Sequence, residues 1–241
     1  MMGWRGRLGF LVPPGNPTVE PEMMELVPPG VSLHFTRMAA SGPAGTHSGQ
    51  EERNRSQLES LDACCALLAM VSPNVIVMAH TATSYTLGRE AEAELVRRLE
   101  QSTGTRFITA FGSVLAALEH LGARRIAYAT PYGEDMTLTG KAHLEKHGIE
   151  VVNYARLDNV RNIYEENAER AYAAARKADR PEAEAIFISG VGMPTLGALQ
   201  LLEDDLGKPV LSAASAMMWH ALRVAGIRHA RPGYGRLLAG G

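Results

Sequence analysis

The feature that most constrains the fold of this chain is the alternation of short β-rich runs with helical segments along its whole length. Apolar runs such as 75–80 and 185–189 are typical of strands buried on both faces of a sheet. Their alternation with helices predicts an α/β fold built on parallel sheets. The expected strands are 7–12, 31–37, 75–80, 106–110, 125–130, 149–155, 185–189 and 209–212, and the expected helices are 17–26, 50–71, 88–101, 112–121, 134–147, 161–178, 195–206 and 214–225.

An internal repeat divides this alternation into two halves. Three segments of the first half resemble three segments of the second half in the same order, each a strand that opens into a turn and a helix. The pairs are 7–16 with 125–134, 75–88 with 185–197, and 107–118 with 210–222. An ordered repeat predicts two equivalent lobes. We expect an N-terminal lobe at 1–110, with about 213–241 packing back onto it, and a C-terminal lobe at 111–212.

Charge and hydropathy exclude several classes of partner. The formal net charge is −2 and no Lys/Arg cluster stands out, so no nucleic-acid partner is expected. The apolar run Leu8–Val12 is short and stops at Pro13, which excludes a signal-peptide core, and no later run has the length of a membrane span. A cytoplasmic location without membrane contact is therefore predicted. The only cysteines, Cys64 and Cys65, are adjacent within a helical segment, which favours core packing over a disulfide or a metal site.

The loop after the third expected strand carries the densest polar cluster. His80 is followed by the hydroxyls of Thr81, Thr83 and Ser84, where the chain runs into a helix. Backbone N–H groups at a helix N-terminus favour an anion, and hydroxyls add further donors. A simple N-cap formed by Ser84 or Thr86 explains one or two hydroxyls but not the whole cluster. We predict a carboxylate site here, with His80 as the acid or base.

The paired loops of the repeat supply further candidates. The loop at Gly190 and Val191 has few side-chain donors, so its contribution would come from main-chain N–H groups aimed at an oxyanion. Asn16 and Tyr132 are the side chains of the other two loops most able to donate to a carboxylate. Each loop also fits an ordinary turn, and the residues alone leave that reading open.

Motifs for other chemistries are missing from the sequence. It contains no glycine-rich dinucleotide or Walker motif and no Gly-x-Ser-x-Gly elbow. The histidines show no metal-ligand spacing such as His-Glu-x-x-His. Neither a metal nor an organic cofactor is expected.

The chain resembles the aspartate/glutamate racemase superfamily, in particular its maleate isomerase and arylmalonate decarboxylase branch. The run from Gly9 to Glu20 and Thr36–Met38 are similar to maleate isomerases, while the tail 230–237 and the helix around Trp219 look like the decarboxylase. The resemblance implies two pseudo-symmetric flavodoxin-like lobes, each a parallel sheet flanked by helices, with a cofactor-free site in the cleft between them.

The resemblance also implies roles for single positions. The two active-site cysteines of these relatives fall on His80 and Gly190, so both are absent here. Thr81 matches a hydroxyl of the decarboxylase pocket, and Asn16 and Tyr132 match carboxylate ligands of maleate isomerase. The segment from Gly42 to Glu52, a mobile loop in these relatives, has a different length here, so no residue of it is carried across.

A cofactor-independent carbon-acid enzyme on a small mono- or dicarboxylate is the function these residues favour. Gly190 supplies neither acid nor base, which disfavours two-base racemisation, and His80 is a poor replacement for a thiolate nucleophile. What remains is chemistry on one face of the substrate carbon. Hydrogen-bond donors of the site stabilise an oxyanion and His80 moves one proton, as in a decarboxylase, isomerase or lyase. The alternatives are a non-catalytic carboxylate-binding or accessory protein, and an interaction protein with a vestigial cleft.

A homo-oligomer is expected from the resemblance. Two apolar segments, Ala63–Met70 and Ala213–Trp219, are able to pack against a partner subunit or against their own lobe. The sequence does not distinguish these two arrangements.

Overall fold

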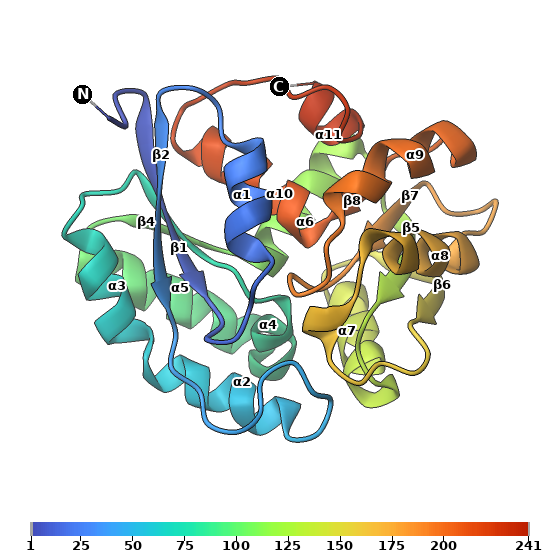
Figure 1. Ribbon diagram of the computed structural model, residues 1–241, viewed down its shortest axis with the longest axis horizontal. Helices are drawn as coiled ribbons and strands as arrows, with labels where there is room; N and C mark the ends of the chain where they lie inside the picture. Colours follow the sequence, from blue (N-terminus) through green and yellow to red (C-terminus); the bar gives the residue numbers. More distant parts are fainter. Residues whose placement is uncertain (1, 241) are drawn as a thin grey trace.

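Two four-stranded parallel sheets form the centre of the protein in the computed structural model, which describes residues 2–240 (Figure 1). The first sheet has the order β2-β1-β3-β4 and the second has the order β6-β5-β7-β8, so the two halves share one topology. This arrangement confirms the predicted α/β fold with two pseudo-symmetric lobes. The strands are β1 Gly6–Val12, β2 Val31–Arg37, β3 Val75–Met78, β4 Arg106–Thr109, β5 Arg125–Thr130, β6 Glu150–Arg156, β7 Ala185–Ile188 and β8 Val210–Ser212.

Helices follow the strands on both halves. They are α1 Val19–Leu26, α2 Gln50–Glu59, α3 Leu61–Ala69, α4 Thr81–Leu87, α5 Arg89–Thr103, α6 Ala110–Leu121, α7 Glu134–Lys146, α8 Ala168–Ala178, α9 Leu196–Leu206, α10 Ala213–Val224 and α11 Arg236–Ala239, with a 3₁₀ turn at Ile163–Glu165. The equivalent helices α6 and α10 are capped in the same way. Thr109 Oγ1 accepts a hydrogen bond from Gly112 N, and Ser212 Oγ accepts one from Ser215 N.

The structure differs from the sequence-based expectation at two helices and one loop. The single helix expected at 50–71 is two helices, because the Ser60 hydroxyl between them donates to the Gln57 carbonyl and accepts from Ala39 N. The helix expected at 161–178 begins only at Ala168, where the Asn167 side chain caps it. The segment 81–87, expected as a loop, is the helix α4.

Both faces of each sheet are buried, as the apolar strands predict. In the first sheet Phe10 and Val77 face a large core that continues into the second lobe, while Leu11 and Ile76 face a smaller core under α3 and α5. This alternation follows the two-residue period of a strand. The larger core reaches Tyr128 and other residues of the second sheet, so the lobes share one continuous apolar interior.

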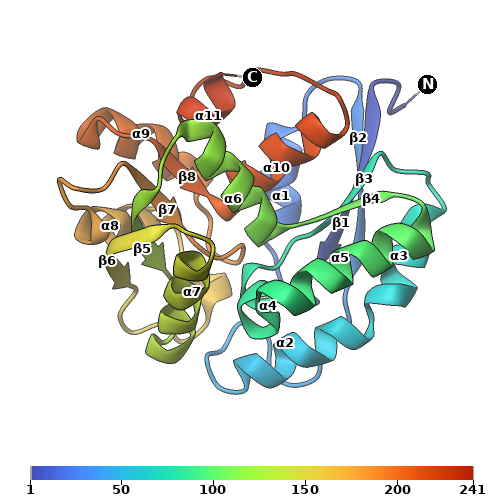
Figure 2. The same ribbon diagram turned by 180° about the vertical axis from the view of Figure 1, so that it is seen from behind.

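The helices α6 and α10 pack against each other between the two sheets (Figure 2). The helix α10 also contacts α1, β3 and β4 of the first half as well as β8 of the second half.

The division of the chain at 110/111 and 212/213 remains a prediction. The segment Ala213–Trp219 is buried within its own chain, whereas Leu67 and Met70 of the other apolar segment are exposed.

Cys64 and Cys65 are free and buried in the smaller core, as predicted from their adjacency. Burial raises the pKa of the Cys65 thiol to about 12, which leaves it protonated and unreactive. None of the helices within residues 2–240 combines the length and the apolar composition that a bilayer crossing requires.

Candidate active site

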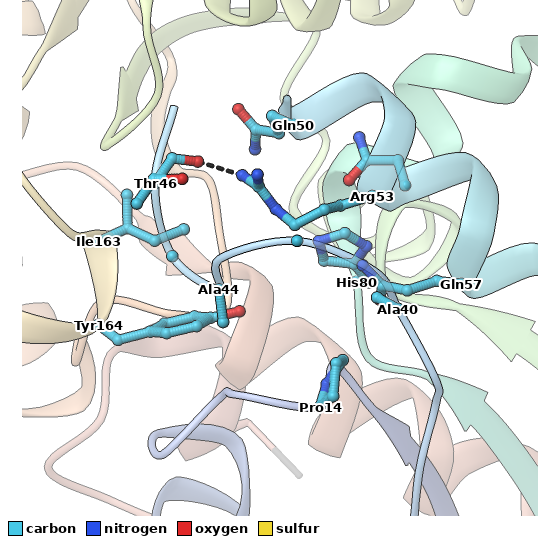
Figure 3. Close-up of a pocket in the computed structure, with 13 residues that line it drawn as sticks. Pro14, Ala40, Ala44, Thr46, Gln50, Arg53, Gln57, His80, Ile163 and Tyr164 are labelled. Atoms are coloured by element: carbon cyan, nitrogen blue, oxygen red, sulfur yellow. Dashed lines mark hydrogen bonds between the residues drawn. The ribbon is translucent and has the colours of Figure 1, made fainter. Parts of the chain in front are cut away.

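A cavity lies where segments of both halves of the chain meet, and Figure 3 shows the side chains that line it. The first half contributes Pro14 after β1, the segment that leads into α2, and His80 after β3. The second half contributes Ile163 and Tyr164 from the 3₁₀ turn. The cavity itself is narrow, with a volume of about 30 Å³, and the space reaches about 400 Å³ only when the open solvent at its mouth is included. It lies beyond the carboxyl ends of β1 and β3, where open α/β sheets bind ligands.

His80 lines this cavity although only 9% of its surface is exposed. Its ring Nδ1 lies 2.5 Å from Thr83 Oγ1, one turn along α4. Ring Nε2 has no hydrogen-bond partner within residues 2–240. Burial, with a smaller contribution from the Arg53 charge, lowers the pKa of His80 to about 4. The ring is therefore neutral at neutral pH, and one nitrogen is available to accept a proton.

Three of the predicted binding residues come together beside His80 at the strand ends. A Cβ atom placed on Gly190 would lie 3.3 Å from the Tyr132 hydroxyl. Tyr132 is also close enough to Thr81 for that hydroxyl to influence its pKa, which burial raises. The Thr81 hydroxyl is fully buried and has no hydrogen-bond partner among the described residues. A buried hydroxyl without a partner costs free energy, which a bound acceptor would recover.

Asn16 and Val191 join the two lobes directly. Asn16 Nδ2 donates to the Val191 carbonyl at 3.0 Å, and Asn16 Oδ1 accepts from Thr18 N and Val19 N at the start of α1. In this conformation the side-chain amide of Asn16 holds the Gly190 loop in place rather than facing the cavity. The amide nitrogen carries a second N–H that no hydrogen bond among the described residues uses, so the predicted role of Asn16 as a carboxylate donor remains a prediction.

The hydroxyls of Thr83 and Ser84 are hydrogen-bonded to other side chains of the protein in this conformation. Thr83 contacts His80 as described, and the Ser84 hydroxyl donates to Glu92 Oε1 at 2.6 Å. Ser84 is fully buried and is not among the residues lining the cavity. Its engagement with Glu92 gives no support to the predicted role of Ser84 as a substrate donor. Of the predicted site residues, only His80 lines this cavity.

A second link between the lobes was not expected from the sequence. Glu22 of α1 accepts hydrogen bonds through Oε1 from Thr195 N at 2.6 Å and Leu196 N at 3.1 Å, at the N-terminus of α9. Its other oxygen, Oε2, is buried without a partner. Burial outweighs the lowering effect of these bonds and raises the pKa of Glu22 to about 7. With Asn16, this carboxyl group fixes both ends of the loop between β7 and α9.

The segment before α2 covers the cavity and is bonded to the other half of the chain. His47 Nε2 lies 2.9 Å from the Pro131 carbonyl, and Ile163 N donates to the Gly45 carbonyl at 2.8 Å. Gly45 has a φ of +77°, and a Cβ there would lie 1.8 Å from Asn162 Oδ1, so only glycine fits this close approach.

Arg53 of α2 also lines the cavity and was missed by the sequence analysis. It lies in the polar run 50–57, which is typical of a solvent-facing helix, yet only 8% of its surface is exposed. No local signal marks it, because the fold alone turns this face of α2 toward the cavity. No group of three or more His, Cys, Asp or Glu side chains within residues 2–240 is arranged to hold a metal ion.

Sequence and structure comparisons match this chain to maleate isomerases and an arylmalonate decarboxylase over nearly its full length. The sequence profile of the family described as arylmalonate decarboxylase matches residues 8–238. A maleate isomerase from Nocardia farcinica is 34% identical over 98% of this chain and 96% of its own, and an arylmalonate decarboxylase from Bordetella bronchiseptica is 32% identical over 95% of each chain. A maleate isomerase variant from Pseudomonas putida S16, solved with maleate, superposes with a TM-score of 0.88 at 26% identity over 98% of both chains.

Proposed function

Because the chain belongs to the arylmalonate decarboxylase family, in the maleate isomerase and arylmalonate decarboxylase branch of the aspartate/glutamate racemase superfamily, we propose that it transfers a proton at carbon in a small carboxylate without a cofactor. The observation that carries this proposal is His80 in the cavity between the lobes. Its ring is neutral at neutral pH and has a free Nε2.

Thr83 determines which nitrogen of His80 does the chemistry. When the ring proton is on Nδ1, it donates to Thr83 Oγ1 across the 2.5 Å contact, and the lone pair of Nε2 is left for the substrate. In that tautomer Nε2 accepts a proton from a carbon next to a carboxylate. The imidazolium that results then returns the proton to the carbanion. The tautomer and ring orientation are fixed by one hydrogen bond, as general-base catalysis requires.

The carboxylate next to the reacting carbon is bound in this proposal by Thr81, Tyr132 and the main chain at Gly190 and Val191. Removing the α-proton moves negative charge onto the carboxylate oxygens, forming an enediolate. Hydroxyl donors in a buried site stabilise that charge more strongly than water does. Loss of CO₂ from a malonate-type substrate that binds with its other carboxyl group protonated gives the enediol form of the same species. Nε2 of His80 takes the O–H proton, which leaves the enediolate, and the resulting imidazolium returns that proton to the carbon. The intermediates of isomerisation and decarboxylation therefore carry their negative charge on the same carboxylate oxygens.

Residue 190 restricts the reaction to one face of the carbon. Gly190 has no side chain to act as a second acid or base, so His80 delivers and removes the proton from the same side. Residue 80 is histidine rather than cysteine, which disfavours covalent thiolate addition. A non-catalytic carboxylate binder is the weaker reading, because the named relatives are enzymes and a binder has no need of a neutral, oriented imidazole.

A ligand screen followed by a product assay tests the proposal. Malonates, maleate, hydroxy acids and amino acids are first ranked by the rise in melting temperature that each produces, and the hits are then followed by NMR for chemical change. We expect His80→Gln to abolish turnover while keeping the ligand-induced rise in melting temperature. Full turnover in this variant would remove His80 from the mechanism, and binding without any product would favour the non-catalytic reading.

We also propose that the protein is a cytoplasmic homo-oligomer. The exposed apolar side chains Leu67 and Met70 of the segment Ala63–Met70 support an interface on α3. Light scattering of the purified protein tests this, with a Leu67→Glu variant as the perturbation. A monomeric mass for the unmodified chain would contradict it, and cell fractionation tests the location.

A further inference from the structure

A row of buried hydroxyl groups lies behind the Gly190 loop and crosses from one half of the chain to the other. Tyr85 of α4 belongs to the first half, and its hydroxyl lies 2.9 Å from Ser189 Oγ, directly after β7 of the second half. The Tyr128 hydroxyl of β5 donates to the Tyr85 hydroxyl at 3.4 Å. All three side chains are buried. Because buried hydroxyls need hydrogen-bond partners, the position of each one constrains the next.

Tyr132 lies at the end of this row that faces the site. Burial raises the pKa of Tyr132, and hydrogen bonding to the Thr81 and Ser189 hydroxyls lowers it in part, so both hydroxyls are within reach of the Tyr132 oxygen. A Cβ on Gly190, the residue after Ser189, would lie 3.3 Å from the same oxygen. The hydroxyl row is thus formed by Tyr128, Tyr85, Ser189 and Tyr132, and it leads to a donor that the proposed function assigns to the substrate carboxylate.

The helix α7 leaves room for the two inner tyrosines at Gly140. A Cβ on this residue would lie 2.4 Å from the Tyr128 hydroxyl and 2.8 Å from the Tyr85 ring. Gly140 stands inside α7, which lies beside α4 (Figure 2). Glycine is a poor helix former, so local preference disfavours it at this position. The close approach of the two phenol groups accounts for it.

The direction in which the hydroxyls donate follows from the charge at the open end of the row. Each hydroxyl has one proton to donate and lone pairs with which to accept. A carboxylate or enediolate oxygen only accepts, so Tyr132 donates to the bound anion and accepts from Ser189. Ser189 then accepts from Tyr85, which accepts from Tyr128, as the 3.4 Å contact between the tyrosines already does. A hydroxyl that accepts a hydrogen bond becomes a stronger donor.

We propose that Tyr85, Tyr128 and Ser189 are positioning residues, which orient and polarise the Tyr132 hydroxyl toward the negative charge that forms on the substrate carboxylate. This inference rests on the proposed function, which places that carboxylate at Tyr132. The carboxylate oxygens carry more charge in the enediolate than in the bound substrate. The hydroxyl row therefore acts on kcat more than on binding.

The test uses variants that remove one hydroxyl and keep the aromatic ring. Exchange of α-protons for deuterium in D₂O is followed by NMR at saturating malonates, hydroxy acids and amino acids. We expect Tyr85→Phe to slow exchange by about three- to tenfold and Tyr128→Phe, one step farther along the row, by about twofold. Ligand affinity should change by less than about twofold in both. The control Tyr154→Phe removes a surface hydroxyl bonded to Glu134 and should exchange at the wild-type rate.

A double-mutant cycle distinguishes action through Tyr132 from a role in packing. Tyr132→Phe removes the donor itself and should slow exchange by about 100-fold. Adding Tyr85→Phe to it should slow exchange by less than about twofold more, because residues that act through one group are not additive. Ser189→Ala interrupts the hydroxyl row without changing a tyrosine, and its loss should be at least that of Tyr85→Phe.

The outcomes separate this inference from the proposed function. Additive losses in the double variant, a larger loss in Tyr128→Phe than in Tyr85→Phe, or wild-type exchange in Ser189→Ala would each overturn the role of the hydroxyl row and leave the proposed function standing. Absence of exchange by the wild type with every carboxylate would overturn the proposed function, and this inference with it.

Discussion

Replacing Glu22 by glutamine tests the carboxyl group that joins α1 to the N-terminus of α9. Burial raises the pKa of this group from 4.5 to about 7, with partial compensation by the Thr195 and Leu196 N–H groups. The native protein therefore holds the proton more tightly than the unfolded chain does. Its stability is highest below about pH 4.5 and falls as the pH rises toward 7, because the unfolded chain ionises first.

The size of this effect follows from the shift. A pKa difference between 4.5 and about 7, at about 1.4 kcal/mol per pH unit, corresponds to about 3 kcal/mol of stability lost by pH 8. Most of this loss falls between about pH 5 and pH 8. Glutamine cannot ionise but keeps an oxygen for the two N–H donors. The free energy of unfolding of Glu22→Gln relative to the wild type should therefore rise by about 2 to 3 kcal/mol across that range.

Urea unfolding of the wild type and the variant at several pH values measures this difference directly. The control is Glu119→Gln, which changes an exposed glutamate of α6 and should show no pH-dependent difference. A constant difference between Glu22→Gln and the wild type from about pH 5 to pH 8 would refute the assignment of a buried, proton-holding carboxyl group between the lobes.

Three further predictions concern the site. Because burial lowers the pKa of His80 to about 4, kcat/KM should stay constant from about pH 7.5 to pH 5.5, where an unshifted histidine would lose about tenfold, and such a loss would contradict a neutral base. Thr83→Val removes the partner of His80 Nδ1, so kcat should fall about tenfold with unchanged ligand affinity; Thr83→Ser should restore it, and an unchanged kcat in Thr83→Val would refute the orienting role. Gly190→Ala places a Cβ 3.1 Å from Pro131 Cγ at a φ of +90°. It should lower the free energy of unfolding in urea by about 1 to 2 kcal/mol more than the control Gly122→Ala, where nothing lies within 4 Å of the added Cβ. Equal losses in the two variants would contradict this crowding at Gly190.

The fold was predictable because the repeat and the strand pattern are encoded locally. The apolar runs at 75–80 and 185–189 indicate strands that are buried on both faces of a sheet. The ordered repeat predicts two equivalent sheets, which the structure has. Helix boundaries were less predictable where polar side chains compete for the backbone. Ser60 divides one expected helix through its bond to Gln57, and no hydropathy pattern contains that bond.

The candidate site was predictable only in part. His80 was recognised because it follows a buried strand in a chain with a repeat, and the structure brings Thr81, Tyr132 and Gly190 together nearby. Arg53 was not recognised, since a charged residue in a polar helix carries no sign of burial.

The partners of other polar residues were equally hidden from the sequence. Ser84 and Asn16 have polar side chains in the expected loops, but Ser84 is bonded to Glu92 and Asn16 to Val191. Long-range partners of this kind depend on how the lobes meet, which a local pattern does not contain.

Solvent deuterium incorporation tests the central claim most directly, namely that His80 moves a proton to or from carbon in a bound carboxylate. The protein is incubated in D₂O with a carboxylate that raises its melting temperature, and the α-position is followed by NMR. The wild type should introduce deuterium there, and His80→Gln should do so about 100-fold more slowly or not at all while binding the ligand equally well. Equal incorporation by the two proteins would contradict the account.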